Sequence, residues 1–413
     1  MAAACGDRFD LVVVGAGIMG SCAAYYAAKR GLRVLLLEQF DFLHGLGSSH
    51  GESRTIRATY PENYYPSMVL EARCLWEEAQ AEAGYRVVTS TAHFDFGPED
   101  NKSLQSVIDS GGHHREVNIR LIDRGSSSSV FSGVFALPDG WIGVVSDIGG
   151  VIRPTKAVAM FQALALKKGA ILKDRTRIIA IEKDGENREG VRVRAAGGEI
   201  FLGSKCVITA GAWMKKLVKS VTEIDLPIQP LHTTICYWKI KAGHEAEFTA
   251  EGGFPTFASY GDSYIYGTPS LEFPGLIKIA LHGGRPCDPD RRDWTASSSG
   301  VMVDSVGEWI RKILPGKVES GNPVITQACL YSMTPDGDFV IDFLGGEFGK
   351  DVVVAGGFSG HGFKMGPVVG RIVAEMAIDG AVEGLEIRHF GIRRFAECSS
   401  GNAKEFEEQV SSH

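Results

Sequence analysis

Residues 9–20 have the sequence FDLVVVGAGIMG, and this stretch decides the fold. Residues 9–14 are apolar and rich in valine, which is typical of a buried parallel strand. Glycines then turn the chain, and the alanine-rich residues 19–30 predict a helix that a glycine ends. Residues 32–37 predict the next strand. Together these segments predict one complete βαβ unit.

The glycines in this stretch match the dinucleotide-binding pattern G-x-G-x-x-G. Gly15 permits the tight turn, Gly17 lets the backbone reach a pyrophosphate, and Gly20 lets helix and strand pack closely. Free N–H groups at the helix start favour the phosphates. Glu38, which closes the second strand, can accept hydrogen bonds from ribose hydroxyls. The alternative is a tight turn that binds no ligand, and the pattern alone does not choose between FAD and NAD.

Other segments extend this picture along the chain. Two later strand ends, residues 210–213 and 355–358, are rich in glycine and suggest a long cofactor that is contacted along its whole length. Ordinary strand-to-helix turns are the alternative. Residues 40–62 are rich in Gly, Ser, His and Arg and are expected to form a loop. Helical patterns occur at residues 65–83, 154–168, 299–313 and from about 367. Strand patterns occur at residues 176–182, 191–195, 199–202 and 206–213, and residues 86–150 are mixed and strand-rich. In residues 226–285 apolar and polar residues alternate, which is typical of an antiparallel sheet.

Composition excludes several classes of protein. The net charge of −7 argues against nucleic acid as a partner. The eight cysteines are scattered without a C-x-x-C pair, which favours a reducing compartment and argues against a zinc site. No apolar run is long enough to predict a membrane span. The chain ends in SSH, which is not a peroxisomal address of the Ser-Lys-Leu type.

Several separated motifs carry a resemblance that spans nearly the whole chain. They are VVVGAG at 12–17, GESRTIR at 51–57, GLIK at 275–278 with His282, CLY at 329–331, and GFSGHGFK at 357–364. With these motifs the chain resembles the monomeric sarcosine oxidase family of FAD-dependent amine oxidases, which includes pipecolate and N-methyltryptophan oxidases. The resemblance implies FAD rather than NAD.

The resemblance implies an α/β fold, α+β overall, with two discontinuous domains. A Rossmann-type FAD-binding domain carries an inserted substrate domain built on a mixed, largely antiparallel sheet. We expect the FAD-binding domain at residues 1–88, 150–217 and 328–395, the substrate domain at 89–149 and 218–327, and a C-terminal tail at 396–413.

The resemblance also implies that Cys329 holds FAD covalently, through a thioether to the 8α-methyl group of the flavin. A thiolate is a good nucleophile for such a bond. The alternative for Cys329 is a buried, inert cysteine. His361 lies in the loop GFSGHG, where we expect backbone contacts with the flavin to matter more than side chains. The glycines of that loop are Gly357, Gly360 and Gly362.

Arg57 and Lys364 match the family's residues that bind the substrate carboxylate. An arginine fork grips a carboxylate in a bidentate way, and a lysine adds a point charge. Arg54 is expected beside the flavin ring. For both arginines and for Lys364 the alternative is a solvated surface cation.

Lys278 matches the lysine that lies over the flavin and promotes its reaction with O₂, since a fixed positive charge stabilises developing superoxide. The alternative is an edge-strand lysine. His282, four residues on, is expected on the same side of a strand and in the substrate pocket. Tyr266 and Tyr331 match pocket tyrosines, and His50 matches a histidine near the flavin. Plain core packing is the alternative for these four.

These residues predict an oxidase of secondary amino acids, with sarcosine and L-pipecolate as the first candidates. The C–H beside nitrogen gives a hydride equivalent to the flavin, the imine is hydrolysed, and O₂ is reduced to H₂O₂. No metal and no membrane partner is expected, and the family suggests a monomer. Alternatives are a dehydrogenase with another electron acceptor, a related N-methyl or proline-type oxidase, and a non-catalytic flavoprotein. Peroxisome and cytoplasm both stay open as locations.

Overall fold

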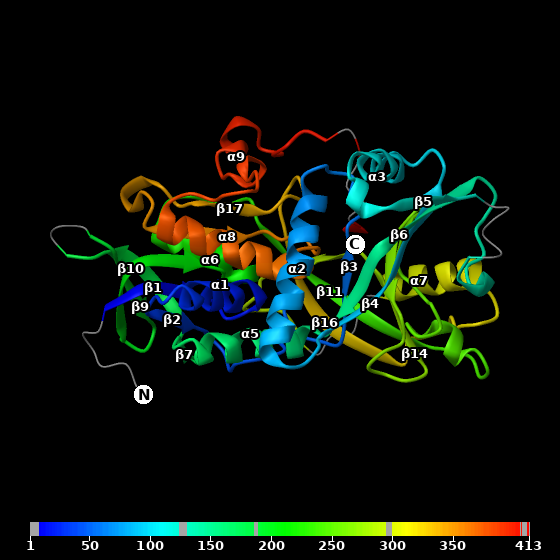
Figure 1. Ribbon diagram of the computed structural model, residues 1–413, viewed down its shortest axis with the longest axis horizontal. Coiled ribbons are helices and arrows are strands. Elements are labelled where there is room, and N and C mark those ends of the chain that lie inside the picture. Colours follow the sequence, from blue (N-terminus) through cyan, green and yellow to red (C-terminus); the bar gives the residue numbers. More distant parts are fainter. Residues whose placement is uncertain are drawn as a thin grey trace.

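Two sheets at opposite ends of an elongated molecule organise the chain (Figure 1). The computed structural model describes residues 8–123, 130–185, 189–294, 300–404, 406 and 411–412. The first βαβ unit lies in one sheet, and the long antiparallel strands lie in the other. Within the described residues, no helix is long and apolar enough to cross a membrane.

The first sheet is parallel at its centre. Among the described residues it contains eight strands. Six of them lie in the order β17-β18-β10-β1-β2-β7, and the hairpin of β8 and β9 joins the sheet where β9 pairs with β10. β17 is antiparallel to β18, while the other neighbours along this path are parallel. The bounds are β1 Arg8–Val14, β2 Val34–Leu37, β7 Ile171–Lys173, β8 Ile178–Lys183, β9 Val191–Ala195, β10 Ile200–Ile208, β17 Val340–Phe343 and β18 Val352–Gly356.

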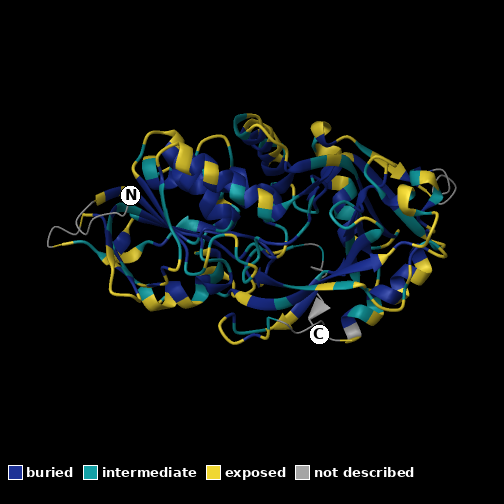
Figure 2. Cartoon of the chain, turned by 90° about the horizontal axis from the view of Figure 1, so that it is seen from below, coloured by how far each residue is buried: buried dark blue, intermediate teal, exposed yellow. Residues whose placement is uncertain are grey.

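Strand β1 is buried on both faces, which explains its continuous apolar sequence. Leu11 and Val13 belong to one core cluster, whereas Val12 and Val14 belong to another on the opposite side. Helices cover both faces of this sheet. Their bounds are α1 Ile18–Lys29, α2 Tyr65–Ala83, α5 Pro154–Lys167, α6 Met214–Val221 and α8 Gly366–Asp379. α1 packs closely on α8, and Figure 2 shows the buried interior beneath exposed outer helix faces.

The second sheet is long and largely antiparallel. Its order among the described residues is β19-β15-β11-β14-β13-β12-β4-β6-β3, with β16 beside β11 and β5 beside β6. α3 (Lys102–His113) and α7 (Gly300–Ile313) accompany this sheet. The bounds are β3 Arg54–Arg57, β4 Val88–Pro98, β5 Ile119–Ile122, β6 Trp141–Ile152, β11 Gln229–Lys239, β12 Thr256–Tyr260, β13 Tyr264–Thr268, β14 Leu276–Leu281, β15 Gly283–Pro286, β16 Ile325–Met333 and β19 Ser411–Ser412.

The structure corrects one sequence-based prediction. Residues 40–62 were expected to form a loop, but they contain β3, which pairs with β6. β12 pairs with β4 in the parallel direction, so the second sheet is mixed and largely antiparallel, as predicted. Both pairings join segments far apart in the sequence, so local patterns do not reveal them. The predicted helix at 65–83 is confirmed as α2. The domain boundaries stay a prediction.

Candidate functional site

A cavity of about 500 Å³ is lined by residues of both sheets. One end of its wall contains the turn after β1, including Gly15 and Gly17, together with Glu38. The other end contains Arg57, Lys364 and tyrosines of the second sheet. Most sequence-predicted site residues therefore meet in one cavity. The predicted residues that line it are Gly15, Gly17, Glu38, Arg54, Arg57, Tyr266, Lys278, His282, Cys329, Tyr331, Gly360, Gly362 and Lys364, while Gly20, His50 and Gly357 are not among its wall residues.

The turn between β1 and α1 has no space for side chains. A Cβ atom on Gly15 would lie 2.5 Å from the carbonyl oxygen of Thr209, and one on Gly20 would lie 1.9 Å from the carbonyl oxygen of Gly15. Gly15 also has a φ of +98°. The N-cap residue of α1 is Gly17, which has no side chain, and the N–H of Ile18 donates to Oγ of Ser49 at 3.1 Å. The positive end of the α1 dipole faces this turn and favours an anion there.

Glu38 stabilises the same turn. One carboxylate oxygen accepts a hydrogen bond from the backbone N–H of Ala16 at 2.8 Å, and the other accepts from Phe40 at 3.1 Å. The side chain is nearly buried. Its predicted contact with ribose hydroxyls stays a prediction.

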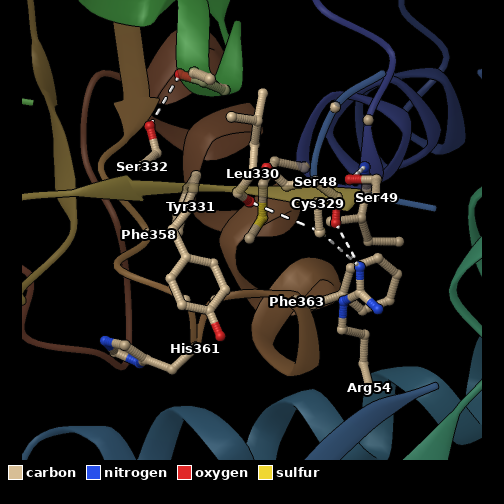
Figure 3. Close-up of a pocket in the computed structure, with 18 of the residues that line it drawn as sticks. Ser48, Ser49, Arg54, Cys329, Leu330, Tyr331, Ser332, Phe358, His361 and Phe363 are labelled. Carbon is tan, nitrogen blue, oxygen red and sulfur yellow. Dashed lines mark hydrogen bonds between the residues drawn. The ribbon is translucent and has the colours of Figure 1, made fainter. Parts of the chain in front are cut away.

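Cys329, on β16, is a buried thiol beside a cation. Arg54 donates to its sulfur at 3.6 Å and also to the carbonyl oxygens of Ser48 and His50 (Figure 3). Burial alone raises the pKa of a thiol, but the positive charge of Arg54 and hydrogen bonding from His50 outweigh burial. The pKa of Cys329 therefore falls from 9.0 to about 6. The thiolate is the prevailing form at neutral pH.

Lys278, on β14, is 2% exposed. Its Nζ donates to the carbonyl oxygen of Ser53 at 3.0 Å and lies 5.3 Å from the ring centre of Tyr266. Burial, with repulsion from Arg54, lowers the pKa of Lys278 from 10.5 to about 7. The fixed charge expected from the sequence is therefore a group that titrates near neutral pH.

Aromatic groups gather beside Lys278. The hydroxyls of Tyr266 and Tyr331 lie 3.2 Å apart, and the ring centre of His282 is 5.2 Å from that of Tyr331. Burial lowers the pKa of His282 to about 4, so its imidazole is neutral at pH 7. Gly360 lies against this group, because a Cβ there would come within 2.7 Å of His282.

Arg57 and Lys364 share Tyr60 as a neighbour. The guanidinium carbon of Arg57 lies 4.1 Å from the ring centre of Tyr60, and Nζ of Lys364 donates to its hydroxyl at 2.8 Å. Lys364 is 5% exposed and also donates to the carbonyl oxygen of His361. Burial, with repulsion from Arg57, lowers the pKa of Lys364 well below its usual value. The guanidinium of Arg57 and the amine of Lys364 thus contact the same tyrosine in the wall of the cavity.

Comparison with known sequences identifies the family. A model of the family described as "FAD dependent oxidoreductase" matches residues 10–376. The chain belongs to this family. It is 58% identical to "Probable sarcosine oxidase" of Arabidopsis thaliana over 98% of this chain and 96% of that one. It is 32% identical to "Peroxisomal sarcosine oxidase" of Homo sapiens, with 94% and 97% of the two chains covered, and 31% identical to "Monomeric sarcosine oxidase" of a Bacillus strain over 94% and 97%.

Solved structures share the fold. NikD, described as an unusual amino acid oxidase, superposes with a TM-score of 0.78 at 22% identity over 93% of this chain and 97% of that one. L-proline dehydrogenase from P. horikoshii also gives 0.78, at 23% identity over 95% and 98%. The predicted α/β fold, the sarcosine oxidase family and the use of FAD are confirmed, and the chain is an FAD-dependent oxidoreductase.

The cavity fits FAD. The glycine turn and the dipole at the start of α1 suit a pyrophosphate, and the same cavity wall includes Cys329. In this wall Oγ1 of Thr233, which is paired with Cys329 across β11 and β16, is buried and has no hydrogen-bond partner in the protein. Buried polar atoms without partners are rare, and they suit a ligand with polar ring atoms. Among the described residues, no cluster of His, Cys, Asp and Glu could hold a metal ion.

The sequence reading missed several residues of the cavity. Tyr60, Tyr260 and Tyr264 line it near Arg57. His93 also lines the cavity and forms a fully buried pair with Asp95, in which Nε2 of His93 is 3.1 Å from Oδ1 of Asp95. One signal for this pair was present in the sequence: His93 and Asp95 alternate with apolar residues in a predicted strand region. Ionisable side chains in such positions are usually buried only with a partner.

Proposed function

We propose that the protein is an FAD-dependent oxidase of secondary amino acids, with sarcosine and L-pipecolate as its first candidate substrates. The observation that carries this proposal is that Arg57 and the proton acceptor Lys364 both contact Tyr60 in a cavity that also contains Lys278 and Cys329. The names of the sarcosine oxidase relatives support it.

Arg57 and Lys364 bind the substrate carboxylate. In the free protein Lys364 is held away from its ammonium form by burial and by Arg57. A carboxylate between the two cations reverses that repulsion, because the anion stabilises the ammonium form. Binding of the substrate is therefore coupled to protonation of Lys364.

The aromatic group receives the rest of the substrate. Tyr266, Tyr331 and neutral His282 surround the space with rings and hydroxyls that carry no charge. Such surroundings disfavour an ammonium ion and favour the neutral amine, whose lone pair the reaction requires. FAD, when bound, supplies the oxidising power by taking two electrons from the amine and passing them to O₂.

Cys329 holds the cofactor through a thioether bond between its sulfur and the 8α-methyl carbon of the flavin. Arg54 and His50 support this role, because they keep a buried thiol ionised. Lys278, in its ammonium form, stabilises the negative charge that develops when O₂ is reduced.

The protein acts as a monomer of 44.5 kDa on a small-molecule substrate. The name of the Bacillus relative supports this assembly, and light scattering on the purified protein measures it. The name of the human relative supports a peroxisomal location, with the cytoplasm as the alternative. A full-length fluorescent fusion that stays diffuse in the cytosol would exclude the peroxisome.

Peroxide formation in air tests the activity. The assay compares sarcosine with dimethylamine, and L-pipecolate with piperidine, because each pair differs only in the carboxylate. We expect peroxide with at least one amino acid and a rate lower by about a hundredfold or more with its partner. Equal rates within both pairs would refute the role of Arg57 and Lys364. Bleaching of the flavin without peroxide would support a dehydrogenase with another acceptor.

A further inference from the structure

The C-terminal segment, which we define as residues 394–404 with Phe406, returns to the cavity. It follows α8 and begins with α9 (Arg394–Glu397), and in Figure 1 it runs from α9 toward α3. Phe406 lines the same cavity as Pro61 and Glu62, the two residues that follow Tyr60. The segment therefore reaches the end of the cavity that contains the two carboxylate-binding cations.

Two buried carboxylates hold this segment. Nε of Arg394 donates to Asp336 at 2.8 Å, with the two side chains 8% and 0% exposed. The backbone N–H of Asn402 donates to the same carboxylate at 2.9 Å, and its side-chain amide donates to Asp338 at 2.7 Å. Charged hydrogen bonds of this kind are stronger than neutral ones, and burial removes competition from water. The segment is consequently fixed up to Asn402.

Lys404 continues the attachment to the cavity wall. Its Nζ lies 2.6 Å from Oε1 of Glu62 and 3.3 Å from Oδ1 of Asp338. The three side chains are 11%, 13% and 0% exposed, so this is a shielded ion-pair group. The ring centre of Phe406 is 5.6 Å from the same Nζ. Lys404 thus joins Phe406 to the loop that carries Tyr60.

We propose that Phe406 is a specificity-determining residue, the apolar outer wall of the substrate end of the cavity, and that Lys404 positions it. The proposal rests on the proposed function for one point, the binding of the carboxylate at Arg57 and Lys364. Sarcosine carries only a methyl group on its nitrogen and offers little apolar surface to Phe406. The six-membered ring of L-pipecolate offers more and gains more from apolar contact.

Substitution of Phe406 tests the proposal. The readout is kcat/KM for L-pipecolate divided by kcat/KM for sarcosine, because this ratio does not depend on the fraction of active protein. A lost methylene-sized contact in an apolar pocket changes specificity by roughly 10-fold to 200-fold. We expect Phe406→Ala to lower the ratio by about tenfold and Phe406→Leu to lower it less. The matched control is Leu121→Ala on β5, an apolar side chain that is 60% exposed and not among the wall residues.

Lys404→Met tests the positioning role. In this variant Asp338 keeps its hydrogen bonds from Tyr64, Tyr65 and Asn402, whereas Glu62 loses its ion pair with the C-terminal segment. We expect the ratio to fall in the same direction as in Phe406→Ala, but by less. The control is Lys350→Met, at an exposed lysine that is not among the wall residues, and it should leave the ratio unchanged. An unchanged ratio in Phe406→Ala, which includes an equal loss for both substrates, would overturn the proposal. A rise in the ratio would overturn it as well.

A binding measurement separates this proposal from the proposed function. Acetate and benzoate are carboxylates of different size that the protein does not oxidise, and their binding to the oxidised holoenzyme is followed by the flavin absorbance. We expect Phe406→Ala to weaken benzoate about tenfold and to leave acetate unchanged. If the wild-type protein oxidises neither amino acid, the proposed function fails, and the benzoate-to-acetate ratio still decides whether Phe406 forms the wall. An unchanged ratio would overturn the inference.

Discussion

Replacing Arg54 with methionine should prevent Cys329 from ionising at neutral pH. Arg54 places its guanidinium 3.6 Å from the sulfur, and the pKa of Cys329 is about 6 although the side chain is only 3% exposed. Cys236, also 3% exposed, has a pKa raised to about 12 by burial. The two thiols differ in their neighbours rather than in their burial. Without Arg54, the pKa of Cys329 should therefore rise at least to the ordinary thiol value of 9.0.

The size of the effect follows from the titration. Lowering the pKa from 9.0 to about 6 corresponds to about 4 kcal/mol of preference for the thiolate. At pH 7 a thiol with a pKa of 6 is about nine-tenths ionised, whereas one with a pKa of 9 is about one-hundredth ionised. Covalent attachment of FAD requires the thiolate, so its rate should fall by roughly a hundredfold at pH 7 in Arg54→Met.

The assay mixes flavin-free protein with FAD and measures the flavin that stays in the acid-precipitated pellet over time. In the wild type the rate should be constant above pH 7 and fall as the pH drops through about 6. In Arg54→Met it should still be rising at pH 9, and Arg54→Lys, which keeps the charge, should lie between them. If Arg54→Met attaches FAD at the wild-type rate with the wild-type pH profile, the electrostatic reasoning is wrong.

Three further outcomes are expected. In Lys278→Met the flavin should be reduced at the wild-type rate, but the reduced flavin should react with O₂ roughly a hundredfold more slowly. In the wild type the O₂ reaction should slow as the pH rises through about 7, where Lys278 loses its proton. Equal loss of both half-reactions in the variant would contradict this role of Lys278. Acetate binding to the wild type should take up a proton, because the anion favours the ammonium form of Lys364, and Lys364→Met should abolish that uptake; calorimetry in two buffers over a range of pH measures it. Gly20→Ala should lose FAD and unfold at lower temperature, because its Cβ would overlap the carbonyl oxygen of Gly15, whereas Gly31→Ala, where a Cβ meets no atom within 4 Å, should retain FAD.

The sequence predicted the parts of the fold that local patterns encode. The apolar run of β1, the glycine turn and α1 are adjacent in the chain, and each follows a rule of composition and period. α2 was predicted with its observed bounds. By contrast, β3 is only four residues long and lies between glycine-rich and polar residues, so its identity as a strand depends on pairing with distant β6.

For the candidate site too, the sequence indicated some features and could not indicate others. Motifs of the sarcosine oxidase family indicated Arg54, Cys329 and Lys364, and the structure brings them to one cavity. Their protonation could not be predicted, because it depends on burial and on cations from other strands. Phe406 gave no signal in the sequence, since only the attachment of the C-terminal segment to Asp336 and Asp338 brings it to the cavity.

Anaerobic titration of the intact protein shows whether its flavin oxidises a secondary amino acid. Sarcosine and L-pipecolate are added separately in small steps while the visible absorbance of the flavin is recorded, and air is then admitted. We predict that one of the two bleaches the flavin at about one equivalent per flavin and that the colour returns in air with formation of H₂O₂. A protein that contains FAD but keeps its colour with an excess of both amino acids would contradict the account.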